Sequence, residues 1–339
     1  MKIILDAMGG DLAPKAPVLG ALAADKKYEI VLVGDSDAIW EVLKEQGHTT
    51  LPENISVVHT TEVVDMHDDP ANVVRQKKGS SMMVALKMLA DGDGDACISA
   101  GSTGALLSGA TLIVKRVKGI RRAAMGPAMP NKAGGKTILL DCGANAECTP
   151  EFLLQFGLVG SLFAKKQLGI SNPRVGLLNI GSEDSKGTPL QKEAHALLTA
   201  AHEKGLINFI GNIEGRDALL GGVDVVVCDG FSGNVLLKSI EGTAMYMGSL
   251  MKHKIFKRNF LSMIGYLFCK SGVDEVMKLM DYREIGGTQF LGIKKPVIKA
   301  HGSSDEIAFR NAISQAANAA EQDFTAELSE GLAALEAAE

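Results

Sequence analysis

The residues best suited to chemistry lie in a glycine-rich turn after a short β-branched run, Val223–Cys228. The turn reads Asp229-Gly-Phe-Ser-Gly-Asn234, and apolar residues at helical spacing follow it. A strand, a glycine-rich turn and the start of a helix together favour anion binding, because the first N–H groups of a helix have no intrahelical partner. We therefore expect Ser232, Gly233 and Asn234 to face an anionic or polar ligand.

Four further turns of this kind follow other predicted strands. They read Asp6-Ala-Met-Gly-Gly-Asp11, Ser99-Ala-Gly-Ser-Thr-Gly104, Asp141-Cys-Gly-Ala-Asn145 and Gly181-Ser-Glu-Asp-Ser-Lys-Gly187. A single turn of this composition is more often structural than functional. Five of them at the carboxyl ends of strands favour a ligand site, because ligands of parallel sheets bind beyond those ends.

Neutral donors in these turns suit a phosphate or a developing oxyanion. Gly101, Ser102, Thr103 and Asn145 offer backbone N–H groups, hydroxyls and an amide. A nucleophilic role for Ser102 is the weaker interpretation, since no base can be assigned beside it.

Two further side chains each allow two interpretations. Lys186 is the one cation within the five turns, and it is either a solvated loop charge or a contact to phosphate. His301, after the apolar run Pro296–Lys299, is either a turn histidine or a donor to a leaving thiolate or a phosphate.

Composition and motifs argue against several functional classes. A net charge of −5 does not suit a nucleic-acid-binding protein, and no G-x-x-x-x-G-K-[ST], G-x-S-x-G or H-E-x-x-H motif occurs. The five cysteines lack C-x-x-C spacing, so we expect reduced thiols in a cytoplasmic protein and no metal site. We expect no signal peptide, because a strand pattern begins at Lys2, and no apolar run is long enough to span a membrane.

Alternating strand and helix patterns predict an α/β fold. Strands are expected at Lys2–Asp6, Glu29–Val33, Ile55–Val58, Ala96–Ser99, Thr137–Asp141, Arg174–Ile180, Ile207–Ile210 and Val223–Cys228, and helices at Ala16–Ala24, Ser36–Gln46, Ser80–Ala90, Thr103–Val117, Pro150–Leu168 and Thr188–Lys204. Several strands are apolar throughout, which favours a mostly parallel sheet sandwiched by helices. We expect one large α/β domain over residues 1–339.

The segment 243–273 differs from the rest of the chain. It contains no Asp or Glu, and its cations include Lys252, Lys254, Lys257 and Arg258. Apolar residues at spacings of three to four give it an apolar stripe. We predict a protruding, basic, amphipathic helical pair that packs on a second subunit, or whose surface meets an anionic membrane or an acidic protein; these interpretations are compatible.

Together the motifs resemble those of one family. These are Ile4-Leu-Asp-Ala-Met-Gly-Gly-Asp11, Ile98-Ser-Ala-Gly-Ser-Thr-Gly104, Asp141-Cys-Gly-Ala-Asn145, Asn179-Ile-Gly-Ser-Glu183, Gly211-Asn-Ile-Glu-Gly-Arg-Asp217, Asp229-Gly-Phe-Ser-Gly-Asn234 and Ala300-His-Gly-Ser-Ser304. In this order they are similar to the bacterial acyl-carrier-protein:phosphate acyltransferases of phospholipid synthesis, the PlsX family. The resemblance extends from Lys2 to about Asp323.

The resemblance implies transfer of a long-chain fatty acyl group from acyl carrier protein to inorganic phosphate, giving acyl phosphate. It implies a fold related to phosphate acetyltransferases and to isocitrate and isopropylmalate dehydrogenases. It also implies a homodimer that associates peripherally with the membrane, and it requires neither a metal nor an organic cofactor.

Roles in this reaction can be hypothesised from residue chemistry and turn position. Phosphate would be bound by Ser102, Thr103 and Lys186. Asn234 and nearby N–H groups would stabilise the oxyanion, Asp229 would orient Asn234 or Lys186, and His301 would assist departure of the thiolate. The alternatives are a phosphate acetyltransferase that uses a coenzyme A thioester, an NAD-dependent decarboxylating dehydrogenase, and a non-catalytic scaffold that binds lipid or carrier protein.

Overall fold

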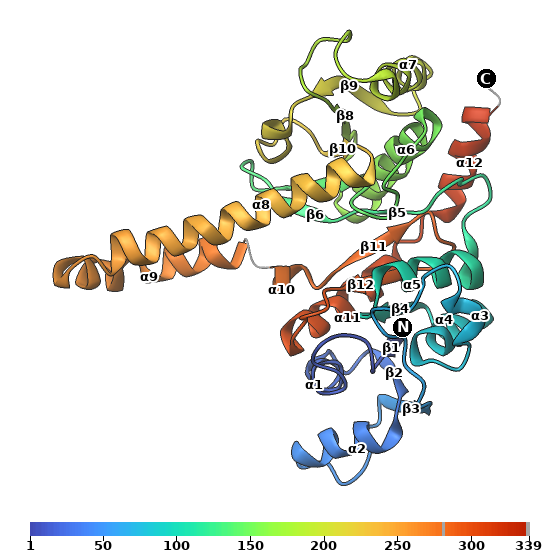
Figure 1. Ribbon diagram of the computed structural model, residues 1–339, viewed down its shortest axis with the longest axis vertical. Helices are drawn as coiled ribbons and strands as arrows, with labels where there is room; N and C mark the ends of the chain where they lie inside the picture. Colours follow the sequence, from blue (N-terminus) through green and yellow to red (C-terminus); the bar gives the residue numbers. More distant parts are fainter. Residues whose placement is uncertain (280–281, 337–339) are drawn as a thin grey trace.

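The computed structural model describes residues 1–279 and 282–336, and its strands form two sheets (Figure 1). The first sheet has seven strands in the order β3-β2-β1-β4-β12-β11-β5. They are β1 (Lys2–Asp6), β2 (Glu29–Gly34), β3 (Ile55–His59), β4 (Ala96–Ser99), β5 (Ala124–Met125), β11 (Gly287–Leu291) and β12 (Val297–Ala300). The neighbours from β3 to β12 are parallel, whereas β11 is antiparallel to both β12 and β5.

Helices bury both faces of this sheet, as its continuously apolar strands require. One face packs on α1 (Lys15–Ala23), α2 (Ser36–Glu45) and α11 (Glu306–Glu321). The other packs on α3 (Val73–Gln76), α4 (Ser81–Asp91), α5 (Thr103–Gly109) and the π-helical continuation of α5, η1 (Ala110–Lys115). We call this sheet and its helices the seven-stranded lobe.

The second sheet has five strands in the order β6-β7-β10-β8-β9. They are β6 (Ala128–Pro130), β7 (Lys136–Leu140), β8 (Arg174–Leu178), β9 (Asn208–Ile213) and β10 (Val225–Val227), all parallel to their neighbours except β6. One face packs on α6 (Pro150–Gln167), α7 (Pro189–Glu203) and α12 (Thr325–Glu336). The 3-10 helix η2 (Gly215–Leu219) and the start of α8 (Gly230–Leu250) cover the other, completing the five-stranded lobe.

The predicted α/β class and mostly parallel strands are confirmed, and every predicted strand has a counterpart near its expected position. The strands are divided between two sheets, although the sequence pattern suggested one. Alternating strands and helices reveal strand direction but not which strands are neighbours. The pieces β5 and β6 have only two and three residues, too short to give a pattern.

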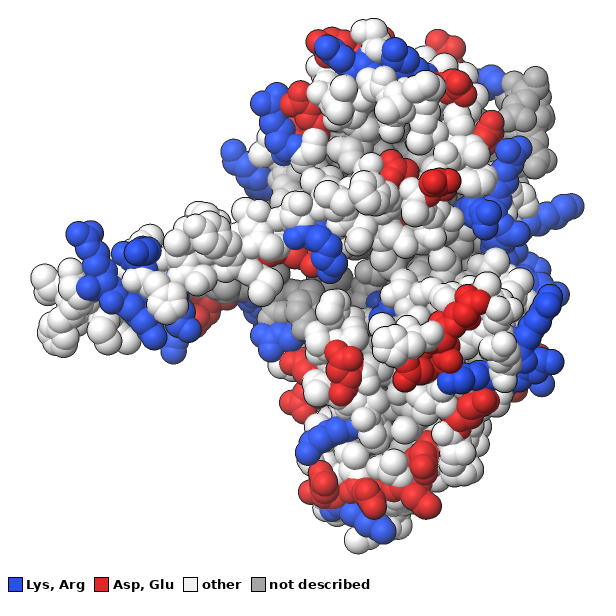
Figure 2. Space-filling model, viewed as in Figure 1, with Lys and Arg blue, Asp and Glu red and all other residues white. Residues whose placement is uncertain are grey.

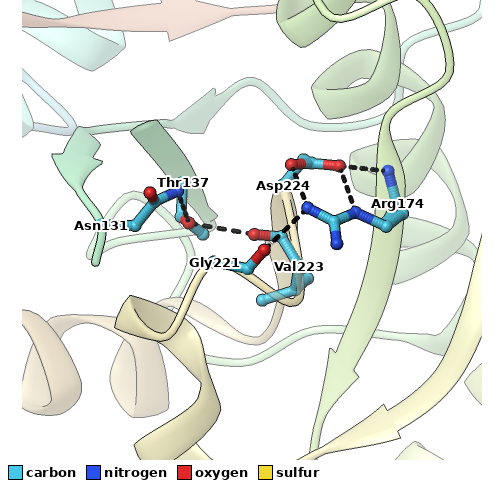
Figure 3. Close-up of polar contacts among 6 residues, drawn as sticks. All are labelled: Asn131, Thr137, Arg174, Gly221, Val223 and Asp224. Atoms are coloured by element: carbon cyan, nitrogen blue, oxygen red, sulfur yellow. Dashed lines mark hydrogen bonds and ion pairs between the residues drawn. The ribbon is translucent and has the colours of Figure 1, made fainter. Parts of the chain in front are cut away.

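A polar network ties together the amino ends of the five-stranded sheet (Figure 3). The Arg174 guanidinium donates to both carboxylate oxygens of Asp224 at 2.9 Å and to the carbonyl of Gly221 at 2.9 Å. Burial alone would raise the pKa of Asp224, but the Arg174 hydrogen bonds outweigh burial and hold this pKa below its ordinary value. Nearby, the Thr137 hydroxyl donates to the carbonyl of Val223 at 3.0 Å.

A helical hairpin protrudes from the body, as predicted (Figure 1). Helix α8 leaves the five-stranded lobe, continues as the π-helix η3 (Met251–Phe256), and is followed by α9 (Phe260–Leu279), which runs back towards α10 (Tyr282–Ile285). Many of its apolar side chains are solvent-exposed, including Leu261 and Phe268 at 77% and 84%. Within the described ranges, no helix is both long and apolar enough to cross a bilayer.

Candidate functional site

In the seven-stranded lobe, three of the polar turns meet at the carboxyl ends of β1, β4 and β12. The N–H of Asp11 donates to the carbonyl of Gly302 at 2.8 Å, joining the first turn to the turn that holds His301. Gly10 has φ +103°, and a Cβ there would lie 2.9 Å from the Cβ of Ala100 and 3.0 Å from the oxygen of Gly302. Glycine at this position therefore allows all three turns to approach closely.

A buried hydrogen bond fixes the strands beneath these turns. The Ser99 hydroxyl donates to the Asp6 carboxylate at 2.6 Å, and the N–H of Gly101 donates to the Ser99 hydroxyl at 3.1 Å. Burial raises the pKa of Asp6 above its ordinary value, although the hydroxyls of Ser81 and Ser99 oppose the rise. This network makes Asp6 a structural anchor for the turn after β4.

Ser102 and Thr103 begin α5, as the sequence predicted. The buried Ser102 hydroxyl is the N-cap and lies 3.5 Å from the N–H of Ala105, which is a long capping hydrogen bond. The N–H groups of Thr103 and Gly104 have no hydrogen-bond acceptor within residues 1–279 and 282–336. Such groups suit an anion at this end of the helix.

In the five-stranded lobe, Asp141 organises the turn after β7. Its buried carboxylate accepts from the N–H groups of Met125 at 2.8 Å, Cys142 at 2.6 Å and Asn145 at 2.6 Å. The Asn145 amide donates to the carbonyl of Ala123 at 2.8 Å and to Asp141 at 3.0 Å. Asn145, expected to bind substrate, therefore has its amide N–H donors directed at protein acceptors.

Asp229 and Ser232 cap α8. The Asp229 carboxylate accepts from the N–H and the hydroxyl of Ser232, both at 2.8 Å, and the N–H of Gly230 donates to the carbonyl of Asn145 at 2.8 Å. The N–H groups of Gly230 and Ser232, at the helix start where anion binding was expected, thus have protein acceptors. Within the described residues, no hydrogen bond joins Asp229 to Asn234 or Lys186. Its expected role of orienting one of these side chains therefore stays a prediction.

The first turn of α8 lies directly against the turn after β7. A Cβ at Gly233 would lie 2.0 Å from the carbonyl oxygen of Asp141, a distance that no side chain can occupy. Two residues after Asp141, a Cβ at Gly143 would be 3.6 Å from the side chain of Asn234, which is solvent-exposed. The packing therefore brings Asn234 beside the Asp141 turn with its amide available to a ligand.

Lys186 lies in an exposed loop after β8. Its carbonyl accepts from the Asn179 amide at 3.2 Å, and its N–H donates to the carbonyl of Glu183 at 3.0 Å. These bonds shape its own loop, and no described contact joins Lys186 to Asn234 or to the turns of the seven-stranded lobe. Its proposed phosphate contact stays a prediction.

His301 links the two lobes electrostatically. Its Nδ1 is 2.8 Å from the Ser303 hydroxyl, and burial, together with Lys238 of α8 and with Lys299, lowers its pKa. Lys238 is paired with Glu241 at 2.7 Å, and its charge also acts to lower the pKa of Cys142 in the five-stranded lobe. The base of α8 thus stands between both sets of turns, where Figure 2 shows the surface hollowed between the lobes.

Lys299 is a candidate site residue that sequence reasoning missed. In register with Ser99 on β4, it directs its ammonium to the carbonyls of Ala100, at 3.2 Å, and Ala300. Burial lowers its pKa to about 8, against the opposing influence of Asp11 and Asp6. The one available signal was a lysine in an apolar strand directly before the His301 turn.

Cysteines near the site are poorly suited to nucleophilic catalysis. Burial raises the pKa of both Cys142 and Cys148 to about 12 and raises that of Cys228 as well. Such thiols carry almost no thiolate at neutral pH. A site without a cysteine nucleophile fits chemistry in which a bound anion attacks directly.

The fold of the chain is shared by solved structures of mixed α/β proteins with mostly parallel sheets. It is similar to a phosphotransacetylase from Streptococcus pyogenes (TM-score 0.60, 19% identity, 95% of this chain and 94% of that one). It is also similar to the EutD phosphotransacetylase from Staphylococcus aureus (TM-score 0.58, 17% identity, 94% of each). A 4-hydroxythreonine-4-phosphate dehydrogenase from Salmonella typhimurium shares the fold more distantly (TM-score 0.52, 15% identity, 95% of this chain and 99% of that one).

Sequence comparison identifies the family. The model of the family described as "Fatty acid synthesis protein" matches residues 1–327. A "Phosphate acyltransferase" from Thermoanaerobacterium thermosaccharolyticum is 47% identical over 325 residues, 95% of this chain and 94% of that protein, and one from Bacillus mycoides is 47% identical over 318 residues, 93% of each. The chain belongs to this fatty acid synthesis (PlsX) family, which confirms the resemblance of its motifs.

Proposed function

We propose that this protein transfers a long-chain fatty acyl group from acyl carrier protein to inorganic phosphate, giving an acyl phosphate for phospholipid synthesis. The proposal is carried by the likeness to named phosphate acyltransferases over nearly the whole chain, at 47% identity over 95% of its length. The start of α5, where the N–H groups of Thr103 and Gly104 have no acceptor among the described residues, and the exposed amide of Asn234 support it. The choice of carrier protein as acyl donor rests on the motif resemblance.

In the proposed step, a phosphate oxygen attacks the carbonyl carbon of the thioester. A carbon–oxygen bond forms, and the carbon–sulfur bond breaks as the tetrahedral oxyanion collapses. The electron pair leaves with sulfur, and the thiolate then takes a proton from solvent or through His301. Because a thiolate leaves readily, the enzyme needs to supply donors and positioning but no nucleophile of its own.

We propose the following roles for the residues of the turns. Phosphate contacts the start of α5, at Ser102 and Thr103, and Lys186 reaches it from the loop after β8. Asn234 donates its amide to the oxyanion beside the Asp141 turn. His301, whose pKa is lowered by burial and nearby cations, is mainly neutral near pH 7 and acts as a hydrogen-bond partner of the leaving sulfur.

Mass spectrometry tests the reaction directly. Incubation with long-chain acyl carrier protein and phosphate should give acyl phosphate and free carrier-protein thiol in equal amounts, and omission of phosphate should abolish both. Binding of carrier protein without phosphate-dependent turnover would instead favour a non-catalytic scaffold.

Variants test the assigned donors. Asn234→Ala should lower kcat by roughly 10²-fold, the usual loss for removal of one oxyanion donor, and Lys186→Ala should lower phosphate-dependent turnover because it removes the proposed phosphate contact. Lys192→Ala, an exposed lysine of α7, is the matched control and should keep wild-type turnover. Wild-type release of carrier protein by both site variants would overturn these assignments.

A phosphate acetyltransferase acting on a coenzyme A thioester is the second candidate, because the solved structures of similar fold include phosphotransacetylases. Comparing kcat/KM for acetyl-coenzyme A and for long-chain acyl carrier protein separates the two. A preference for acetyl-coenzyme A would favour the second candidate.

The hairpin formed by α8, η3 and α9 completes the proposed function. We assign it to a homodimer interface and to peripheral contact between a cytoplasmic enzyme and an anionic membrane. Its exposed apolar side chains and the exposed cations Lys252, Lys254, Lys257 and Arg258 support both contacts.

A further inference from the structure

A second basic surface lies on the body of the protein, away from the hairpin. The segment 115–122 reads Lys-Arg-Val-Lys-Gly-Ile-Arg-Arg and contains five cations in a chain of net charge −5. It pairs with the turn before β12: the N–H of Val117 donates to the carbonyl of Gly292, and that of Lys294 to the carbonyl of Lys115, both at 2.9 Å. We call segment 115–122 together with Lys294 the basic platform.

The basic platform is a firmly held surface. The side chains of Val117 and Ile120 are buried in the core of the five-stranded lobe, at 4% and 6% exposure. The Gln155 side chain of α6 donates to the carbonyl of Gly119 at 3.0 Å and accepts from the N–H of Arg121 at 2.9 Å. Its shape is therefore largely formed before any partner binds.

Most of its charges are available to a partner. Arg121 lies 3.9 Å from Glu151, a long ion pair. Lys115, Lys118 and Lys294 are solvent-exposed, and none forms a salt bridge within the described part of the chain. Figure 2 shows Lys and Arg side chains gathered where the two lobes meet, on the side opposite the hairpin.

Both ends of the basic platform lead to the candidate site. Upstream, α5 and η1 run from Thr103 to Lys115, a helical span of about 20 Å at 1.5 Å per residue. Downstream, the carbonyl of Ala123 accepts from the Asn145 amide, and the N–H of Met125 donates to Asp141, both at 2.8 Å. A partner seated here stands beside both lobes, one helix length from the start of α5.

We infer that the basic platform is the docking surface for an acidic protein that presents a thioester on a flexible arm. This inference rests on the proposed function and identifies the carrier protein as the occupant. A surface set back from the reacting atoms suits a substrate whose acyl group sits at the end of an arm. Positive charge along the platform would also steer an acidic partner into place and raise its association rate.

An anionic membrane fits this surface less well than the hairpin. Membrane-surface helices combine cations with an exposed apolar face. The apolar side chains of the platform, Val117 and Ile120, point into the core, and Leu112 is the exposed apolar neighbour on the preceding helix, at 59%. The two anionic partners are therefore assigned to two separate surfaces.

Charge reversal tests the assignment. The triple variant K115E/K118E/K294E should raise the KM for acyl carrier protein at least tenfold at low ionic strength, and the effect should shrink in 0.5 M salt because salt screens exposed charges. Turnover of an acyl-pantetheine thioester, which lacks the protein, should stay within twofold of wild type. The matched control K26E/K44E/K192E reverses three exposed lysines elsewhere and should change both KM values less than twofold.

The outcomes separate this inference from the proposed function. Failure of the wild-type protein to form acyl phosphate overturns the proposed function, whereas wild-type turnover with an unchanged KM in the platform variant overturns only the docking surface. Equal effects of the two triple variants would also overturn it, since the effect would then come from net charge. Loss of binding to phosphatidylglycerol vesicles with an unchanged KM would assign the platform to the membrane and contradict the inference.

Discussion

At the scale of single residues, Lys299 is the least expected feature of the site. Its ammonium is largely buried between the carbonyls of Ala100 and Ala300, in register with Ser99. Buried lysines normally lose their charge unless they are paired, because desolvation disfavours the ammonium. The nearby carboxylates of Asp11 and Asp6 oppose this effect, and the pKa of Lys299 is about 8. Lys299 therefore changes its charge in the mildly alkaline range.

This shift predicts a pH-dependent stability. Below about pH 8, Lys299 is protonated in both the folded protein and the unfolded chain. Between about pH 8 and 10.5, it is protonated in the unfolded chain but not in the folded protein. The free energy of unfolding therefore rises with pH across this range. Relative to Lys299→Met, the wild-type free energy of unfolding should rise by about 3 kcal/mol between pH 7 and 10.5. Urea denaturation across this range measures it, and a difference independent of pH would contradict the assigned burial.

At the scale of elements, β8 and β10 are fixed by an ion pair at one end and are followed by candidate site residues at the other. The Arg174–Asp224 pair holds their amino ends, while the Lys186 loop and the Asp229 turn follow their carboxyl ends. The stabilising ion pair and the candidate site residues therefore lie at opposite ends of the same strands, a separation that parallel strands make possible.

Asp224→Asn should accordingly lower the free energy of unfolding by about 1–3 kcal/mol, the usual contribution of hydrogen bonds to a charged group. The lowered pKa of Asp224 means that this stability is full above pH ~4 and is lost as pH falls through the folded-state pKa. Urea midpoints at pH 7 measure the loss, and KM should be unchanged. Glu203→Gln, an exposed carboxylate of α7, is the control; equal midpoints for both variants would contradict a structural role for the pair.

Elements and their end residues were largely predictable from the sequence, because strand and helix periodicities and turn glycines are local signals. Helix α5 begins at Thr103, the predicted first residue of a helix, and α8 begins in the glycine-rich turn where the sequence predicted a helix start. Partners across the fold were not predictable: Asn145 bonds Ala123, and Lys299 sits beside Ala100, 199 residues earlier. Nothing local in the sequence encodes those contacts.

At the scale of the whole molecule, the hairpin projects a basic and apolar surface well beyond the body (Figures 1 and 2). Between its helices, a cavity of about 550 Å³ is lined by residues that include Met251, Phe256 and Leu267. A monomer rarely exposes so much apolar surface without a partner. A second copy along the helices and a membrane at the tip would together cover it.

Lys257→Glu with Arg258→Glu tests the membrane contact. Each cation near an anionic surface contributes about 1 kcal/mol, so reversing two should weaken binding to phosphatidylglycerol vesicles at least tenfold. Carrier-protein turnover in the absence of vesicles should change little if the platform, and not the hairpin, binds that partner. Vesicle sedimentation at low salt measures binding, and K26E/K44E is the matched control. Unchanged binding and turnover would leave the hairpin with a dimeric role alone.

The contact at Gly233 has a consequence for how such motifs are searched in genomes. Glycine is required there because the carbonyl of Asp141 would lie 2.0 Å from any Cβ, so the constraint is one of space. A pattern built on this glycine selects chains that can pack the turn, whether or not they retain the exposed amide of Asn234. A degenerate copy of the gene, having lost catalysis but kept its shape, would still match. If Asn234 donates to the oxyanion as proposed, a pattern intended to separate active from inactive copies should weight Asn234 above its glycine neighbour.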